Sequence, residues 1–267
     1  MLRRLEGAEK PWTDDPVFRA WRFCNVHRED DKTTKWFNDY VRSKVKGLRA
    51  VEACLIFRWF NRIETGERII SHLLHGWNHD SAYYSLKDVK PLVTGAYMIK
   101  TVSGMNKLDG ILWSIDDALP KLPSMIRAWG HSLREATEDL STLNHIGPFM
   151  AYEIVSDLRH TDVLNKAGDI NRWANAGPGC AHGLGLVIDG QRYKFNRNSA
   201  HDQALMNICM HQLLMMSRNP DYWPKQYAPW EMREVEHWAC EYDKYCRANS
   251  GEQLKRRFQH EMPGLSS

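Results

Sequence analysis

The segment LSTLNHIGPFMAYEIVSDL, residues 140–158, decides the fold. A helix ends near Leu143, the tight turn HIGP follows, and a second helix begins at Pro148. Gly147 supplies a permissive backbone in the turn, and proline is preorganised for the first position of a helix. Because the first N–H groups of a helix have no partner within it, the start of the second helix is suited to bind an anion such as phosphate.

Two helices joined by such a turn form the pattern of a helix-hairpin-helix, which holds the DNA backbone without reading base sequence. A plain corner between two helices gives a similar pattern, so both interpretations stay open. The segment resembles the helix-hairpin-helix DNA glycosylases, in which a catalytic aspartate follows the hairpin glycine and is often followed by Asn. Asp169 and Asn171 match that arrangement. Asp169 is equally suited to cap a helix INRWAN, and the two roles are compatible.

Apolar residues recur at helical spacing on both sides of this segment. The expected helical stretches are residues 15–46, 48–62, 64–75, 122–157, 201–217 and 229–249. Two short stretches, residues 95–104 and 186–195, are hairpin candidates because they combine β-branched or aromatic residues with glycine. A helix is equally allowed over the first of them. No low-complexity linker divides the chain. We therefore expect an all-α fold, similar to the helical domain of the helix-hairpin-helix glycosylases, in one domain over residues 1–267, with at most a small β insertion.

Composition limits the classes of function. Of the 267 residues, 43% are hydrophobic and 26% are charged, which suffices for a core and excludes a disordered chain. The net charge of +3 permits a nucleic-acid partner without requiring one. The sequence has no apolar run of 18 residues and no apolar leader near its start, so we expect a cytoplasmic protein without a membrane partner.

The residue pattern predicts no dedicated metal site. The six cysteines form no CxxC pair, which excludes a zinc ribbon and an iron–sulfur loop, and we expect them to be reduced. The histidines of HLLHGWNHD, residues 72–80, lack a recognisable partner ligand, so a polar helix face is favoured. Glu234, His237 and Glu241 share one helix face, for which a solvated face and a site role both stay open.

Two segments repeat one arrangement of arginine and asparagine. RFCNVHRED, residues 22–30, and RWFNRIE, residues 58–64, each place Asn three residues after Arg on one helical face. Polar groups within such aromatic stretches must be hydrogen-bonded or functional. Solvated helix charges and a joint site for a multiply charged phosphate group are the two open interpretations. The residues of this candidate site are Arg22, Asn25, Arg28, Arg58, Asn61 and Arg62.

Five segments together carry a resemblance to a known family. They are RFCNVHREDDKTTKWF, ACLIFRWFNRIET, HIGPFMAYEIVSDL, ANAGPGCAHGLG and EVEHWACEYDKYCRANSGE, spread over residues 18–252. The chain resembles the phage thymine-hypermodification proteins called α-glutamyl/putrescinyl thymine pyrophosphorylases. Those proteins are relatives of the helical domain attached to 5-hydroxymethyluracil DNA kinases, and they are allied to the helix-hairpin-helix glycosylases.

The resemblance implies an amino acid:DNA or polyamine:DNA transferase that acts in the host cytoplasm during phage infection. Its substrate would be double-stranded DNA in which thymine is replaced by 5-hydroxymethyluracil and pyrophosphorylated by a kinase. The amine of an amino acid such as glycine, or of a polyamine, would displace the pyrophosphate. No P-loop GxxxxGK[ST] occurs here, so the kinase is an expected partner rather than this chain itself. A glycosylase for a modified base and a non-catalytic DNA-binding scaffold stay open as alternatives.

Such a reaction needs cations for the leaving group, a general base for the amine and an aromatic pocket for a flipped base. The arginines named above would supply the cations, and Asp169 or Glu153 would be the base. The candidates for the pocket, with a place in the core as their alternative, are Tyr152, Trp173, Trp59 and Phe60. The expected phosphate-binding residues are Arg28, Arg62, Gly147, Pro148 and Tyr152, with Gly177 and Gly179 as an anion nest or else a flexible turn. No cofactor is required, although Mg²⁺ could assist.

Overall fold

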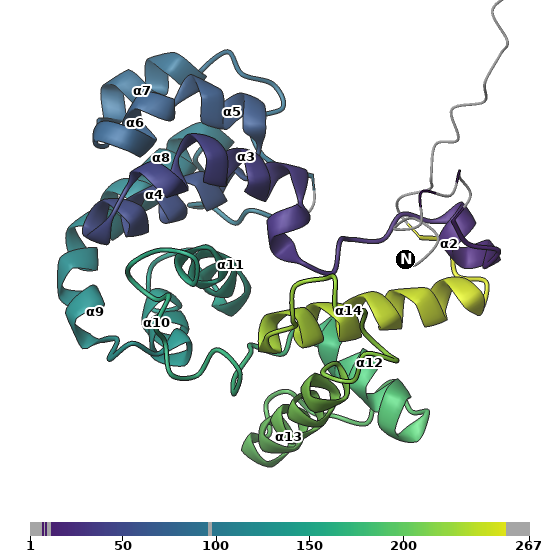
Figure 1. Cartoon of the computed structure of the whole chain (residues 1–267). Helices are drawn as coiled ribbons and strands as arrows, with labels where there is room; N and C mark the ends of the chain where they lie inside the picture. Colours follow the sequence, from purple (N-terminus) through teal and green to yellow (C-terminus); the bar gives the residue numbers. More distant parts are fainter. Residues whose placement is uncertain (1–6, 8, 10–11, 96–97, 255–267) are drawn as a thin grey trace, which may run out of the picture. The chain divides into compact units, whose positions relative to one another are not determined.

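The computed structural model describes residues 7, 9, 12–95 and 98–254, and the helices drawn in Figure 1 are the only regular secondary structure in this part of the chain. The all-α prediction is therefore confirmed for the described residues. They fall into two compact units. The middle unit is residues 27–175, and the terminal unit combines the described residues of 1–26 with those of 176–267. None of the described helices is long and apolar enough to cross a membrane.

The middle unit holds most of the helices. They are η1 (Arg28–Asp30), α3 (Lys32–Tyr40), η2 (Arg42–Lys44), α4 (Gly47–Phe60), α5 (Ile63–Arg68), α6 (Ile70–His75), α7 (His79–Leu86), α8 (Lys107–Ala118), η3 (Leu119–Lys121), α9 (Leu122–Ala128), α10 (Leu133–Leu140) and α11 (Pro148–Leu158).

Helix α4 forms the centre of the middle unit because it has almost no polar side. From Ala53 to Phe60 every residue is buried. A helix that is apolar all round is stable only when other elements cover it. Helices α6, α9 and α11 pack against α4, and Phe57 stacks on Phe37 of α3 with ring centroids 4.4 Å apart. The helix ends at Asn61, whose left-handed backbone (φ 44°) is a conformation that asparagine tolerates better than most residues.

The helix pair predicted within residues 140–158 is present. Helix α10 ends at Leu140, and α11 begins with Pro148 at its first position and Gly147 as its N-cap. The two helices pack against each other. His145, in the turn between them, has a left-handed backbone with φ 63°. The similarity of this pair to the glycosylase hairpin stays a prediction.

The terminal unit consists of α2 (Pro16–Ala20), α12 (Pro178–Asp189), α13 (Ala200–Met216) and α14 (Met232–Asn249). Helix α12 lies directly on α14 because two glycines one turn apart leave room for it. A Cβ atom added at Gly183 would lie 1.9 Å from the carbonyl oxygen of Ala239, and one at Gly179 would lie 2.4 Å from the Sγ atom of Cys240. This close contact of α12 with α14 is the main packing interface of the terminal unit.

The predicted hairpin over residues 186–195 is wrong. Helix α12 continues through Asp189 and ends at Gly190, whose left-handed backbone (φ 66°) closes the helix. An Asp-Gly pair is typical of a hairpin turn, but glycine after a helix also serves as its C-cap, and the apolar residues before it here continue the helix. In the other candidate, residues 95–104, residues 96–97 lie outside the described part and the others form no strand.

The glycine contact between α12 and α14 gives a stability prediction. Gly183→Ala should destabilise the terminal unit by about 1–3 kcal/mol, because backbone atoms of Ala239 occupy the space of the new methyl group and cannot rotate away. Urea unfolding followed by hydrogen exchange of α12 and α14 amides measures the effect. Gly177→Ala is the matched control, since its methyl group would meet only an ordinary 3.7 Å contact with Glu236. Equal stability of the two variants would contradict a tight contact between Gly183 and α14.

Candidate functional site

A fully buried carboxylate, Asp157 of α11, lies at the centre of the polar groups of the middle unit. Arg58 of α4 donates from Nε to Asp157 Oδ2 over 2.5 Å and from Nη2 to Oδ1 over 2.7 Å. The exposed fractions of the two side chains are 2% and 0%. Arg58 also donates from Nη1 to Asn61 Oδ1 and from Nη2 to Thr34 Oγ1. Such a two-pronged pair fixes the angle as well as the distance between α4 and α11.

Two further arginines approach the same carboxylate. Arg28 of η1 lies with Nε 3.4 Å from Asp157 Oδ1 and pairs through Nη1 with Glu153 over 2.7 Å. Arg42 of η2 has Nη1 3.6 Å from Asp157 Oδ1 and is held by Glu29 through both of its terminal nitrogens. The arginines come from three different elements, so Asp157 joins η1, η2 and α4 to α11.

The arginines determine the ionisation of Asp157. Burial alone raises the pKa of this carboxyl, but attraction by Arg58, Arg28 and Arg42 outweighs burial and holds the pKa well below its usual value. The carboxylate therefore keeps its negative charge at neutral pH. A buried charge is tolerable only when it is paired and hydrogen-bonded, which this arrangement provides.

This network contains several residues of the predicted phosphate site. Arg58 and Asn61 are hydrogen-bonded to each other, as their spacing on one helical face predicts, and Arg28 binds Glu153. Arg62 lies apart from Asp157 and pairs with Glu64 over 3.2 Å. The other Arg/Asn pair, Arg22 and Asn25, belongs to the terminal unit, and its predicted helical face is wrong because residues 22–25 form no helix. Each unit thus holds one of the two pairs, and the joint phosphate site stays a prediction.

The structure gives Asp169 three hydrogen bonds at the start of α10. Its carboxylate accepts from the Ser132 hydroxyl over 2.9 Å and from the backbone N–H groups of Leu133 and Arg134 over 2.9 and 3.0 Å. Residues 169–172 form turns rather than a helix. The predicted helix INRWAN is therefore absent, and Asp169 instead caps α10, which starts more than thirty residues before it in the sequence. Its catalytic role stays a prediction.

The aromatic candidates of the middle unit are mostly core residues. Trp59 and Phe60 are fully buried in α4, and Tyr152 of α11 is 5% exposed. Tyr152 meets Trp173 edge to face with ring centroids 5.6 Å apart. At the hairpin, the carbonyl oxygen of Pro148 accepts a hydrogen bond from Asn175, and the space around the Cα of Gly147 is open.

Gly177 and Gly179, the two glycines expected to form an anion nest, have different surroundings at the start of α12. Gly177 is the N-cap of α12, with Pro178 at the first helical position, as at the hairpin. Gly179 faces α14, where Cys240 fills the space beside it. Packing between helices therefore accounts for Gly179, whereas Gly177 retains the geometry of a helix start.

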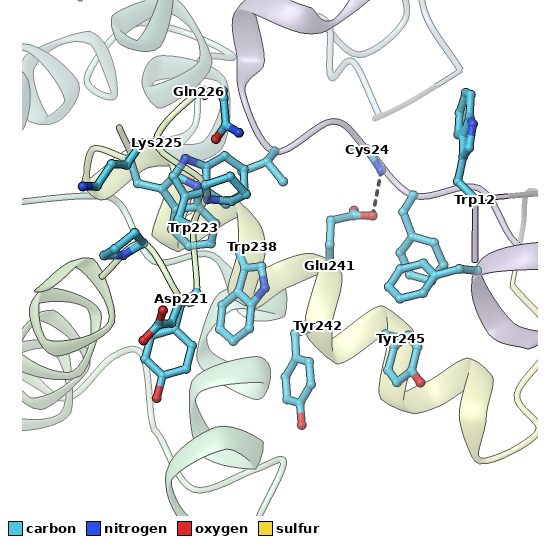
Figure 2. Close-up of a pocket in the computed structure, with 17 residues that line it drawn as sticks. Trp12, Cys24, Asp221, Trp223, Lys225, Gln226, Trp238, Glu241, Tyr242 and Tyr245 are labelled. Atoms are coloured by element: carbon cyan, nitrogen blue, oxygen red, sulfur yellow. Dashed lines mark hydrogen bonds between the residues drawn. The ribbon is translucent and has the colours of Figure 1, made fainter. Parts of the chain in front are cut away.

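Sequence reasoning missed a large aromatic cavity within the terminal unit (Figure 2). Its volume is about 1210 Å³. Aromatic side chains follow one another along its wall, including Trp238, Tyr242 and Tyr245 of α14 in Figure 2. Trp238 stacks on Tyr242 with centroids 5.3 Å apart and rings inclined by 10°, and Trp230 and Trp223 continue the series. The aromatic residues at 238, 242 and 245, which share one helix face, were the sequence feature that could have indicated this cavity.

Polar groups lie among these rings. Asp221, Lys225, Gln226 and Glu241 line the cavity, and Glu241 accepts a hydrogen bond from the backbone N–H of Cys24 over 2.9 Å. Ligand sites are typically concave, mostly apolar and supplied with a few polar groups that fix orientation. This cavity has that character, and its size exceeds the usual range of about 300–1,000 Å³ for one small ligand.

Comparison with known proteins assigns the family. Residues 1–255 match the family model described as "5-hmdU DNA kinase, helical domain". The chain belongs to this helical-domain family. It is also 25% identical, over 271 aligned residues, to a protein named 5-hmdU DNA kinase from Bacillus phage SP10. The alignment covers 91% of this chain and 42% of the phage protein, so the chain spans less than half the length of that relative. No solved structure matches the chain.

Membership confirms the expected relation to the helical domain of the phage kinases. The finer resemblance to the thymine pyrophosphorylases stays a prediction. Both Arg/Asn segments and the hairpin lie within the matched residues. The aromatic cavity does as well, so it is built from residues that the family model covers.

The buried network predicts a large effect of Asp157→Asn. Loss of the charge leaves three buried arginines without their shared partner, which should destabilise the middle unit by about 3–5 kcal/mol. Hydrogen exchange of α4 and α11 amides during urea unfolding measures it. Glu138→Gln is the control, because it breaks an exposed ion pair with Arg134 that should be worth at most about 1 kcal/mol.

The Asp157→Asn variant also shows how much Asp157 contributes to the pH dependence of stability. Because the folded-state pKa of Asp157 lies below its unfolded value of about 3.9, its stabilisation is complete above that pH and declines as the pH falls toward the folded pKa. The stability difference between wild type and Asp157→Asn should therefore be constant from pH 7 to about 5 and shrink below about 4. A difference that grows on acidification would contradict the pairing.

Proposed function

We propose that this chain is a transferase of phage thymine hypermodification. It would act on DNA in which 5-hydroxymethyluracil carries a pyrophosphate on its exocyclic oxygen. The amine of an amino acid such as glycine, or of a polyamine, would replace that pyrophosphate. The modified base would remain in the DNA with a new carbon–nitrogen bond.

The observation that carries this proposal is membership in the helical-domain family, whose description and whose phage relative both name a 5-hmdU DNA kinase. Such a relative supports a role for this chain in the chemistry of one modified base. These 267 residues contain no P-loop of the GxxxxGK[ST] type, so they lack the usual phosphate-binding loop of a nucleotide kinase. A reaction that follows phosphorylation of the base fits both the family membership and the lack of a P-loop in these residues. It also agrees with the resemblance to the thymine pyrophosphorylases.

The aromatic cavity of the terminal unit supports the proposal physically. An enzyme that works on the exocyclic carbon of a base in duplex DNA must flip that base into a pocket and hold it by stacking. The successive rings of Trp230, Trp238 and Tyr242 offer such stacking surfaces. The cavity volume of about 1210 Å³ leaves room for the base together with an amine. Lys225, at the cavity, is a cation suited to an anionic leaving group.

The reaction would be a substitution at the exocyclic methylene carbon. The amine nitrogen forms a bond to this carbon, the carbon–oxygen bond to pyrophosphate breaks, and pyrophosphate leaves with the electron pair. The amine loses one proton to a general base. Asp169 and Glu153 remain the proposed bases. Both carboxylates have partners in the folded chain, Asp169 at α10 and Glu153 at Arg28. Single variants Asp169→Asn and Glu153→Gln test each one through the pH profile of transfer.

A mass measurement tests the proposed activity. The protein is incubated with DNA that contains 5-(pyrophosphoryloxymethyl)uracil and with glycine, serine, glutamate or putrescine, and the digested nucleosides are weighed. A nucleoside heavier than 5-hydroxymethyldeoxyuridine by the residue of one amine is expected. Release of a free base would instead identify a glycosylase. Tight DNA binding with unchanged nucleosides would identify a scaffold, and either result overturns the proposal.

The hairpin gives a prediction for DNA binding. Gly147→Val should weaken binding about 10- to 100-fold on any DNA sequence, because a side chain there blocks hydrogen bonds from the start of α11 to phosphate. The fold should survive, since the backbone (φ −84°) suits valine and the space is open. A mobility-shift assay measures the affinity, and Gly95→Val, at another exposed and open glycine, is the control. Unchanged affinity would show that the hairpin is a structural corner.

The cavity gives a prediction for recognition of the base. Trp238→Ala should lower affinity for DNA with the modified base by about 5- to 150-fold, which corresponds to the 1–3 kcal/mol of one stacking contact. Trp238→Phe should restore part of it. Tyr84→Ala, which removes an exposed ring of the middle unit, is the control. An equal loss on unmodified duplex DNA would contradict a base pocket and indicate a general effect on folding.

A further inference from the structure

Three side chains with metal-binding atoms meet at the edge of the aromatic cavity. They are Cys24, His237 and Glu241, and their ligand atoms all lie within 4.8 Å of one another. His237 and Glu241 are one turn apart on α14, and Cys24 lies in the segment that follows α2. All three residues belong to the terminal unit. The residue pattern predicted no dedicated metal site, and a thiol and two α14 groups from opposite ends of the chain share no local motif that could have indicated one.

We propose that these residues form a site for a divalent ion of the zinc class. Zinc binds thiolate sulfur, imidazole nitrogen and carboxylate oxygen at about 2.0–2.3 Å in a tetrahedron. The three ligand atoms lie within 4.8 Å of one another, so small side-chain rotations would bring them to the spacing of a tetrahedral zinc site. A thiolate ligand selects against magnesium and calcium, which prefer oxygen ligands alone. This site is therefore not the Mg²⁺ site that could assist the proposed reaction.

Hydrogen bonds already hold the carboxylate of Glu241 in place. Its Oε2 atom accepts from the backbone N–H of Cys24 over 2.9 Å, drawn as the dashed line in Figure 2, and from Lys244 Nζ over 3.1 Å. Lys244 Nζ also donates to the carbonyl oxygen of Arg22 over 2.6 Å. Groups that orient a ligand in this way are typical neighbours of metal sites. Within the described part of the chain, Oε1 of Glu241 has no hydrogen bond, so it is the oxygen assigned to the ion.

Three protein ligands leave the fourth position of the tetrahedron for an outside ligand. Catalytic zinc sites have this composition, whereas structural sites use four protein ligands. Cys24 and Glu241 both line the cavity, so the outside ligand would be a water molecule or an anionic oxygen that enters it. Zinc in such a position polarises a bound phosphoryl oxygen. The metal site itself does not depend on the proposed function, because it follows from the three ligands alone.

Cobalt substitution tests the site in the full-length protein. After treatment with a chelator, titration with Co²⁺ should saturate at one ion per chain and give a thiolate-to-cobalt charge-transfer band together with the visible bands of tetrahedral cobalt. Zn²⁺ should displace the cobalt. Cys24→Ser should abolish the charge-transfer band, and His237→Gln and Glu241→Gln should each weaken binding by more than the roughly 10- to 100-fold that loss of an orienting neighbour costs.

Cys209→Ser is the matched control, because it removes another partly exposed thiol of the terminal unit outside the cluster. Cys24 is exposed, so Cys24→Ser should keep the circular dichroism of the wild type. Absence of stoichiometric cobalt binding would overturn the proposal, and so would a charge-transfer band that persists in Cys24→Ser. Neither result bears on amine transfer, which the nucleoside masses test separately.

Discussion

The pairing of Asp157 with Arg58, Arg28 and Arg42 is the interaction on which the middle unit depends. A carboxylate with no exposed surface joins the central helix α4 to α11 and to the two short helices before it. Glu29 and Glu153 add two more negative charges, so the three arginines are paired with three carboxylates. An ion network of this kind adds little stability over an apolar core, but it is intolerant of the loss of any member and therefore fixes one arrangement of helices.

The burial of Arg58 in this ion network limits its direct contact with a phosphate ligand. Arg58 directs its guanidinium to Asp157, Asn61 and Thr34 beneath the surface, so its effect on a ligand would pass through the positions of α4 and α11. Groups that reach solvent are better placed to meet DNA and its leaving group. They include the start of α11 at Gly147 and Lys225 at the aromatic cavity. The middle unit thus contains an ionic framework, and the terminal unit contains the aromatic cavity on which the proposed function relies.

The sequence predicted local features better than long-range ones. Proline after glycine marked the start of α11 correctly, because this is a local backbone preference. Polar groups within the aromatic stretch of Arg58 were expected to be hydrogen-bonded or functional, and Arg58 is hydrogen-bonded. Its main partner, Asp157, lies 99 residues away and resembles any other acidic residue of a helix. The cap formed by Asp169 and the cluster of Cys24 with α14 escaped prediction for the same reason. The 186–195 hairpin failed because one Asp-Gly pair serves both as a turn and as a helix end.

In the proposed reaction an amine displaces pyrophosphate from the modified base. The most direct measurement is the release of inorganic pyrophosphate from 5-(pyrophosphoryloxymethyl)uracil DNA, compared with the incorporation of a radiolabelled amine. We expect the protein to release pyrophosphate only when an amine is present, with one labelled amine retained in DNA for each pyrophosphate released. Release without an amine, with 5-hydroxymethyluracil left in the DNA, would contradict it and indicate a hydrolase.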